Sequence, residues 1–237
     1  MFFVWSQKRI NVKIAFWGPP DSGKTTTIHA LAGQIAARAE ATDVAERPER
    51  AELGMRRNAQ PVEVDEPDTR FTTYFCHPPG KVGEFAGYPV HYQYKTPEQP
   101  LEGNLALDKV LDGISAVVLV ADAATERQRD NEAALRDLVD RLAERFNITP
   151  GTMSARLDQL FGDDGPLRLV LQVNKREVPD AASGDEVRRG LMLPEWVEVV
   201  ETSAIEAEGV WETFEMAGEA IRPLLEAAKE RGRIPTS

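Results

Sequence analysis

A phosphate-binding loop pattern, Gly-x-x-x-x-Gly-Lys-Thr, occupies residues 18–25, directly after the apolar run 12–17. Residues 25–39 follow it and are rich in alanine, as expected for a helix. Between a strand and a helix, the backbone N–H groups of such a loop surround nucleotide phosphates, the lysine reaches the outer phosphates, and the threonine hydroxyl binds Mg²⁺. The first turn of the helix adds its dipole to this anion site. The sequence therefore predicts a nucleoside triphosphate site that uses Lys24 and Thr25.

Composition narrows the classes of partner and compartment. The formal net charge of −11 argues against nucleic acid and anionic membranes as primary partners. A single cysteine, Cys76, excludes an internal disulfide framework and fits a reducing cytoplasm. Residues 1–5 are apolar but too few to span a membrane, so we expect them to cover one edge of a sheet; a weak anchor at a membrane surface is the alternative. The length fits one domain, residues 1–237.

Strand-like and helix-like segments alternate along the chain, which favours an α/β fold with a mostly parallel sheet covered by helices on both faces. Two polar stretches, at about 40–68 and 146–165, are interpreted as insertions, the first mobile with some helix and the second with a short helix. The segments 71–76 and 88–94 are expected to pair as an antiparallel hairpin at the sheet edge. The expected strands are 11–17, 71–76, 88–94, 114–122, 167–173 and 197–202, and the expected helices are 25–39, 127–145, 152–161, 184–191 and a last one from 210.

A second motif, Asn174-Lys-Arg-Glu177, comes directly after the buried strand 167–173. Ligands of open α/β sheets bind at this end of the strands. Guanine-nucleotide-binding proteins with a phosphate loop carry Asn-Lys-x-Asp here, where the carboxylate accepts hydrogen bonds from guanine and the lysine stem lies along the purine. The segment 202–204, Thr-Ser-Ala, stands where a third loop would offer a backbone N–H to the guanine 6-oxo group. In isolation Asn-Lys-x-Glu is also typical of a solvated loop, but its place after the phosphate loop favours guanine recognition.

Several further segments match one family. The most specific is 171–180, Leu-Gln-Val-Asn-Lys-Arg-Glu-Val-Pro-Asp, and the others are 14–26, 68–70, 94–99, 120–122 and 201–214. In these segments the chain resembles the bacterial gliding-motility small Ras-like GTPases of the MglA type, from about residue 11 to residue 225 outside the insertions. The resemblance implies a P-loop NTPase fold, with a Ras-like, mostly parallel six-stranded sheet and one antiparallel edge hairpin.

The resemblance also implies a site, its ligands and a partner. Arg70 falls where the family carries an arginine finger, Gln99 where it carries the water-orienting glutamine, and Lys24 is the phosphate lysine. Thr25 and Thr72 would hold Mg²⁺, and the nucleotides would be GTP and GDP. The implied partner is a roadblock-type regulatory dimer, and the free chain would be a monomer. The candidate nucleotide-binding residues are Gly18, Asp21, Ser22, Gly23, Lys24, Thr25, Thr26, Asn174, Lys175, Glu177, Ser203 and Ala204.

The chain departs from the family pattern at switch and base positions. Glu98 replaces the glycine whose N–H senses the γ-phosphate, and Phe71 aligns with the switch threonine, beside Thr72. Glu177 replaces the guanine-reading aspartate, and Pro20 lies in the phosphate loop where many Ras-like proteins have glycine. These changes predict impaired or altered cycling.

Three functions remain open at this point. The leading one is a switch that hydrolyses GTP slowly. The second is a pseudo-GTPase, an interaction module that binds nucleotide without significant turnover. The third is a small-molecule kinase, which the absence of an obvious arginine-rich lid segment in the sequence disfavours.

Other candidate residues have simpler interpretations. The scattered histidines do not suggest a metal site, Cys76 is expected to be a buried hydrophobe, and Asp122 is expected to form a turn. A partner surface is expected on segments 71–76, 88–94 and 101–110, because all four tyrosines lie in or beside the first two. Packing against helices is the alternative for these tyrosines, which are Tyr74, Tyr88, Tyr92 and Tyr94.

Overall fold

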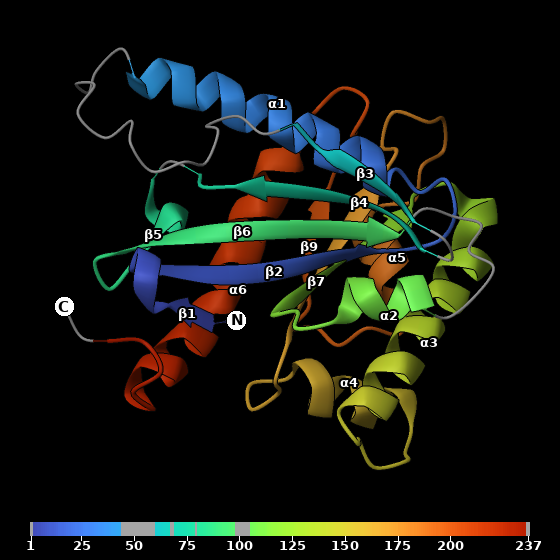
Figure 1. The fold of residues 1–237 in the computed structure, drawn as a ribbon. Helices are drawn as coiled ribbons and strands as arrows, with labels where there is room; N and C mark the ends of the chain where they lie inside the picture. The colour runs from blue at the N-terminus through green and yellow to red at the C-terminus, as the bar shows by residue number, and fades with distance from the viewer. Residues whose placement is uncertain (1, 44–59, 67–68, 79, 98–104, 236–237) are drawn as a thin grey trace.

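The computed structural model describes residues 2–43, 60–66, 69–78, 80–97 and 105–235. They form one twisted sheet with helices on both faces (Figure 1). The order of the main strands is β3 (Val62–Glu66), β4 (Thr69–Cys76), β6 (Tyr88–Pro97), β2 (Arg9–Trp17), β7 (Ala116–Asp122), β8 (Arg168–Asn174) and β9 (Glu198–Glu201). Strands from β6 to β9 in this order are parallel, whereas β3, β4 and β6 pair antiparallel. The predicted α/β class and the six expected strands are confirmed.

Three short strands were not expected. β3 lies in the first insertion and pairs with β4 from outside, so the β4–β6 hairpin is antiparallel as predicted but does not form the sheet edge. β5 (Glu84–Phe85) pairs with β6, and β1 (Phe2–Val4) pairs with the start of the central strand β2. The prediction that residues 1–5 cover an edge is therefore wrong for β1, although Phe3 does pack on Tyr88 with ring centroids 5.0 Å apart.

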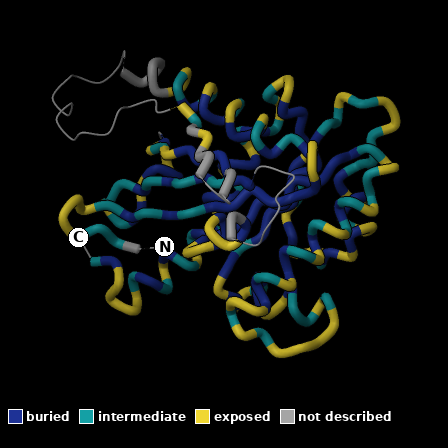
Figure 2. Tube along the Cα trace, turned by 45° about the vertical axis from the view of Figure 1, so that its right-hand side comes forward, coloured by how far each residue is buried: buried dark blue, intermediate teal, exposed yellow. Residues whose placement is uncertain are grey.

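Each face of the sheet is covered by its own helices. On one face, alternate residues of β2 such as Ile14 and Phe16 pack beneath α1 (Lys24–Asp43) and α6 (Val210–Glu230). On the other, Trp17 and β7 residues pack under α2 (Leu105–Leu111), α3 (Gln128–Arg145), α4 (Met153–Phe161) and α5 (Gly184–Gly190). Figure 2 shows the resulting buried strands, with exposed residues on the outer turns and loops. The short helix expected in the second insertion is α4.

The tyrosines of the hairpin belong to the core. Tyr74, Tyr92 and Tyr94 are buried on the α6 face, and Tyr92 meets Phe214 of α6 with ring centroids 5.7 Å apart. The Tyr92 hydroxyl donates to the carbonyl oxygen of Val82 at 2.8 Å. The packing alternative is thus the right one for these three residues, and their interpretation as exposed binding residues is wrong. Burial also raises the pKa of the Cys76 thiol well above its usual range, as expected of an inert thiol.

Pro223 lies inside α6, which runs as one helix from Val210 to Glu230. No described helix is both long and apolar enough to cross a membrane.

Candidate nucleotide-binding site

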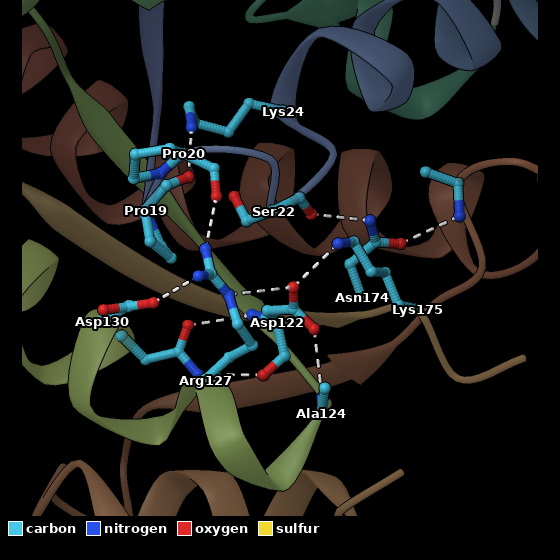
Figure 3. Close-up of polar contacts among 12 residues, drawn as sticks. Pro19, Pro20, Ser22, Lys24, Asp122, Ala124, Arg127, Asp130, Asn174 and Lys175 are labelled. Carbon is cyan, nitrogen blue, oxygen red and sulfur yellow. Dashed lines mark hydrogen bonds and ion pairs between the residues drawn. The ribbon is translucent and has the colours of Figure 1, made fainter. Parts of the chain in front are cut away.

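The candidate site lies where the carboxyl ends of β2, β7 and β8 meet (Figure 3). The phosphate loop follows β2 and leads into α1, Asp122 ends β7, and Asn174 ends β8. In the sheet, β2 has β6 on one side and β7 on the other. After β2 the chain first forms β3, β4 and β6 on one side and then β7, β8 and β9 on the other, so the strand order reverses at β2. Ligands of open α/β sheets bind at such a switch of strand order.

Two glycines of the phosphate loop are required by close contacts. A Cβ atom on Gly18 would lie 2.1 Å from the carbonyl oxygen of Val120 in β7, and Gly18 has φ 155°. A Cβ atom on Gly23 would lie 2.1 Å from Nδ2 of Asn174, and φ is 92° there. The loop is therefore held against both neighbouring strands, and the predicted Gly18 and Gly23 are indispensable to its shape.

Lys24 turns back onto its own loop. It is 6% exposed, and its Nζ donates to the carbonyl oxygens of Gly18 at 3.1 Å and Pro19 at 2.6 Å. Burial lowers the pKa of Lys24 to about 8, and the nearby Asp21 carboxylate partly opposes this shift. An anion in the loop would favour the charged form, so the ammonium group is poised to pair with phosphate.

The first turn of α1 carries Thr25, whose hydroxyl the sequence predicts to bind Mg²⁺. Thr25 is half-buried in the first turn, and the next residue, Thr26, is exposed. Mg²⁺ at nucleotide sites is commonly held by one or two protein oxygens together with phosphates and water, so a hydroxyl here fits the ion. Ser22 is fully buried, and its Oγ has no hydrogen-bond partner among the described residues.

Asn174 joins the phosphate loop to the third loop. Its Nδ2 donates to the carbonyl oxygen of Ser22 at 2.8 Å. Its Oδ1 accepts from the Thr202 hydroxyl at 3.0 Å and from the Ala204 N–H at 2.9 Å. The asparagine is 2% exposed. The structure thus brings together three of the segments that the sequence singled out.

The base-reading residues differ from the simple expectation. One backbone N–H of the third loop, that of Ala204, is bonded to Asn174, while the buried Ser203 Oγ has no hydrogen-bond partner among the described residues. Lys175 has a left-handed backbone with φ 70°, and its Nζ lies 2.8 Å from Oδ2 of Asp122. Glu177 is exposed in the turn that follows.

Asp122 has the turn-forming role that the sequence predicted, and a second role that it did not. The Ala124 N–H donates to Asp122 Oδ1 at 3.0 Å. The other oxygen, Oδ2, meets Lys175 and also Arg127, whose Nε is 3.6 Å away. Arg127 was not singled out beforehand; the only signal was an aspartate at the end of a buried strand with an arginine soon after it.

Of the two residues predicted to act in hydrolysis, Arg70 lies in a described strand and Gln99 lies outside the described residues. Arg70 stands on β4 opposite Asp65 of β3, and Gln99 and Glu98 lie outside the described residues. Thr72 is fully buried on β4 opposite Thr96 of β6. The catalytic roles of Arg70 and Gln99, and the metal role of Thr72, therefore stay predictions.

The sequence of most of the chain is similar to that of a bacterial motility protein. The chain is similar to the mutual gliding-motility protein MglA of Myxococcus xanthus (strain DK1622), with 25% identity over 223 residues. The match covers 93% of this chain and 95% of the relative. No family model matches the chain. The sheet order, the phosphate loop and this similarity over most of both chains together support the resemblance to MglA-like small GTPases that the sequence motifs indicated.

Proposed function

We propose that this protein binds GTP and GDP with Mg²⁺ and acts as a molecular switch that hydrolyses GTP slowly. The observation that carries the proposal is Asn174, which ties the phosphate loop to the third loop through three hydrogen bonds. A phosphate loop alone would suit many nucleotides. A phosphate loop fixed to an Asn-Lys turn and a Thr-Ser-Ala loop is typical of proteins that bind guanine nucleotides.

Each residue has a part in this proposal. Lys24 pairs with the outer phosphates, and Thr25 offers its hydroxyl to Mg²⁺, which neutralises phosphate charge. Arg70 stabilises the charge that develops during water attack on the γ-phosphate, and Gln99 orients that water. Glu177 reads the guanine edge with a longer side chain than aspartate, so the preference for guanine over adenine is expected to be weaker than in relatives with aspartate.

A pseudo-GTPase is the second candidate, and the position of Phe71 favours it. Phe71 is buried in the core beneath the helices on the α2 face, and the Lys95 ammonium lies 4.5 Å from its ring centroid. A side chain committed to packing offers no hydroxyl where the family carries the switch threonine. Nucleotide binding with little or no turnover would follow.

The biological setting follows the relative. The similarity to a gliding-motility protein suggests a role in motility. From the family resemblance of the sequence motifs we further propose a role in cell polarity, a place in the cytoplasm and a roadblock-type dimer as regulator. Because Tyr74, Tyr92 and Tyr94 are buried, a partner surface on segments 71–76 and 88–94 would use other side chains. Phe75, which is 52% exposed on β4, is the leading candidate.

Analysis of co-purified nucleotide by liquid chromatography, followed by a phosphate-release assay, tests the proposal. We expect GTP or GDP on the wild-type protein and none on Lys24→Ala, with slow or undetectable turnover. Bound adenine nucleotide, or equal competition of ATP against a fluorescent guanine nucleotide, would refute guanine binding. Binding without any turnover, even with a roadblock-type dimer, would select the pseudo-GTPase.

A further inference from the structure

Arg127, the last residue of the short helix η3 (Thr125–Arg127), lies between the two ends of the nucleotide site (Figure 3). Its Nη2 donates to the carbonyl oxygen of Pro20 in the phosphate loop at 2.8 Å. Its Nε lies 3.6 Å from Asp122 Oδ2, and Lys175 Nζ lies 2.8 Å from that same oxygen. One guanidinium group and one carboxylate thus connect the phosphate loop with the lysine expected to lie along the base.

The carboxylate at the centre of this connection is held firmly. Asp122 is 2% exposed and ends a strand buried along its whole length. Its backbone N–H donates to Asn131 Oδ1 at 2.9 Å, and its carbonyl oxygen accepts from Asn131 Nδ2 at 2.9 Å. A buried carboxylate is tolerated only when it is paired and hydrogen-bonded, and here Lys175, Arg127 and the Ala124 N–H meet that need.

Arg127 supplies a hydrogen-bond donor to one carbonyl group of the phosphate loop. Inside a loop of this type the N–H groups face the phosphates, so its carbonyl groups need donors elsewhere. The carbonyl oxygens of Gly18 and Pro19 are bonded by Lys24, and that of Pro20 is bonded by Arg127. When nucleotide draws Lys24 toward phosphate, Arg127 still holds the outer side of the loop.

We propose that Arg127 is a positioning residue that controls how fast nucleotide leaves the site. The inference rests on the proposed function, because it assumes that a nucleotide occupies the loop. Arg127 is 31% exposed and also pairs with Asp130 at the start of α3, so a partner can reach it from the surface. A partner that draws the guanidinium away from Pro20 and Asp122 would loosen the phosphate loop and release nucleotide.

The test measures the dissociation rate of a fluorescent GDP analogue from the full-length protein in Mg²⁺ at constant ionic strength. We expect Arg127→Gln to speed release about tenfold, the effect of losing one charged hydrogen bond. Arg127→Lys should fall between wild type and Arg127→Gln, because an ammonium group cannot bond two acceptors with the geometry of a guanidinium fork. Arg129→Gln, an exposed arginine two residues away, and Asp130→Asn, which removes only the outer partner, should stay within about twofold of wild type.

A second measurement separates positioning from folding. Nucleotide-free Arg127→Gln should melt somewhat below nucleotide-free Arg129→Gln, because the buried Asp122 carboxylate loses one partner. The rise in melting temperature on adding GDP should also be smaller for Arg127→Gln than for Arg129→Gln, which a general loss of stability alone would not cause. Release from Arg127→Gln at the rate of Arg129→Gln would overturn the inference, as would a rise in melting temperature on adding GDP that is the same for both variants. Failure of the wild-type protein to bind GDP at all would refute the proposed function and this inference with it.

Discussion

Asn174 offers the sharpest test of how the site is built. Replacing it with alanine removes three hydrogen bonds, those with the Ser22 carbonyl oxygen, the Thr202 hydroxyl and the Ala204 N–H. The side chain is 2% exposed, so water does not readily replace these partners. Each such bond contributes about 1 kcal/mol net, and a buried group left without a partner costs about 1–3 kcal/mol. We therefore expect Asn174→Ala to lower the free energy of unfolding by about 3 kcal/mol.

Urea denaturation of nucleotide-free protein, after chelation of Mg²⁺ and phosphatase treatment, measures this effect without a contribution from bound nucleotide. Gln159→Ala is the matched control, because Gln159 also donates to a backbone carbonyl, that of Ala155 at 3.2 Å, but on an exposed helix face. It should change the free energy of unfolding by less than about 0.5 kcal/mol. A loss below about 1 kcal/mol for Asn174→Ala would show that the phosphate loop and third loop hold their places without the asparagine.

Three further predictions concern charge and turnover. Burial lowers the pKa of both Lys24 and Lys95 from 10.5 to about 8, so between these pH values the unfolded chain binds more protons than the folded one. The free energy of unfolding should therefore rise with pH from about 8 to 10.5, and the rise should be smaller for Lys24→Met and for Lys95→Met. Arg70→Ala should lower any GTP turnover by about 10³, measured as phosphate release, and an unchanged rate would rule out the arginine-finger role. Because the chain and the nucleotide are both anionic, with a chain charge of −11, association of GTP in stopped flow should become faster as salt is added, and slower association would point to a local cationic field.

The central strands were predictable because each is a continuous apolar run within a single segment of the sequence. The apolar run 114–122 became β7, buried on both faces, and the Ala-rich stretch after the phosphate loop became α1. β3 was missed because Val62–Glu66 has few apolar residues and gains strand geometry only by pairing with β4. β1 was misplaced because nothing in residues 1–5 indicates which strand they pair with.

In the site, local motifs were predictable and long-range charge pairs were not. Gly18, Lys24 and Asn174 stand where their motifs placed them, because each motif requires a specific backbone shape at a strand end. The pairing of Asp122 with Lys175 and Arg127 joins the ends of two strands and a short helix. Such a pairing depends on the strand order, which the sequence of any one segment does not contain.

The structure also explains why divergence in this chain would affect turnover before binding. The candidate binding half of the site is built at the ends of β2, β7 and β8. Gly18 lies against Val120 and Gly23 lies against Asn174 so closely that a larger residue at either glycine would disturb the fold. The switch half includes Phe71, which gained a place in the core beneath the helices of the α2 face and lost the hydroxyl of the family's threonine. Phenylalanine in place of the family's threonine therefore adds a side chain to the core and removes only a hydroxyl group that the proposed function assigns to hydrolysis. We infer that most substitutions that abolish nucleotide binding would also destabilise this fold, whereas substitutions that abolish turnover need not.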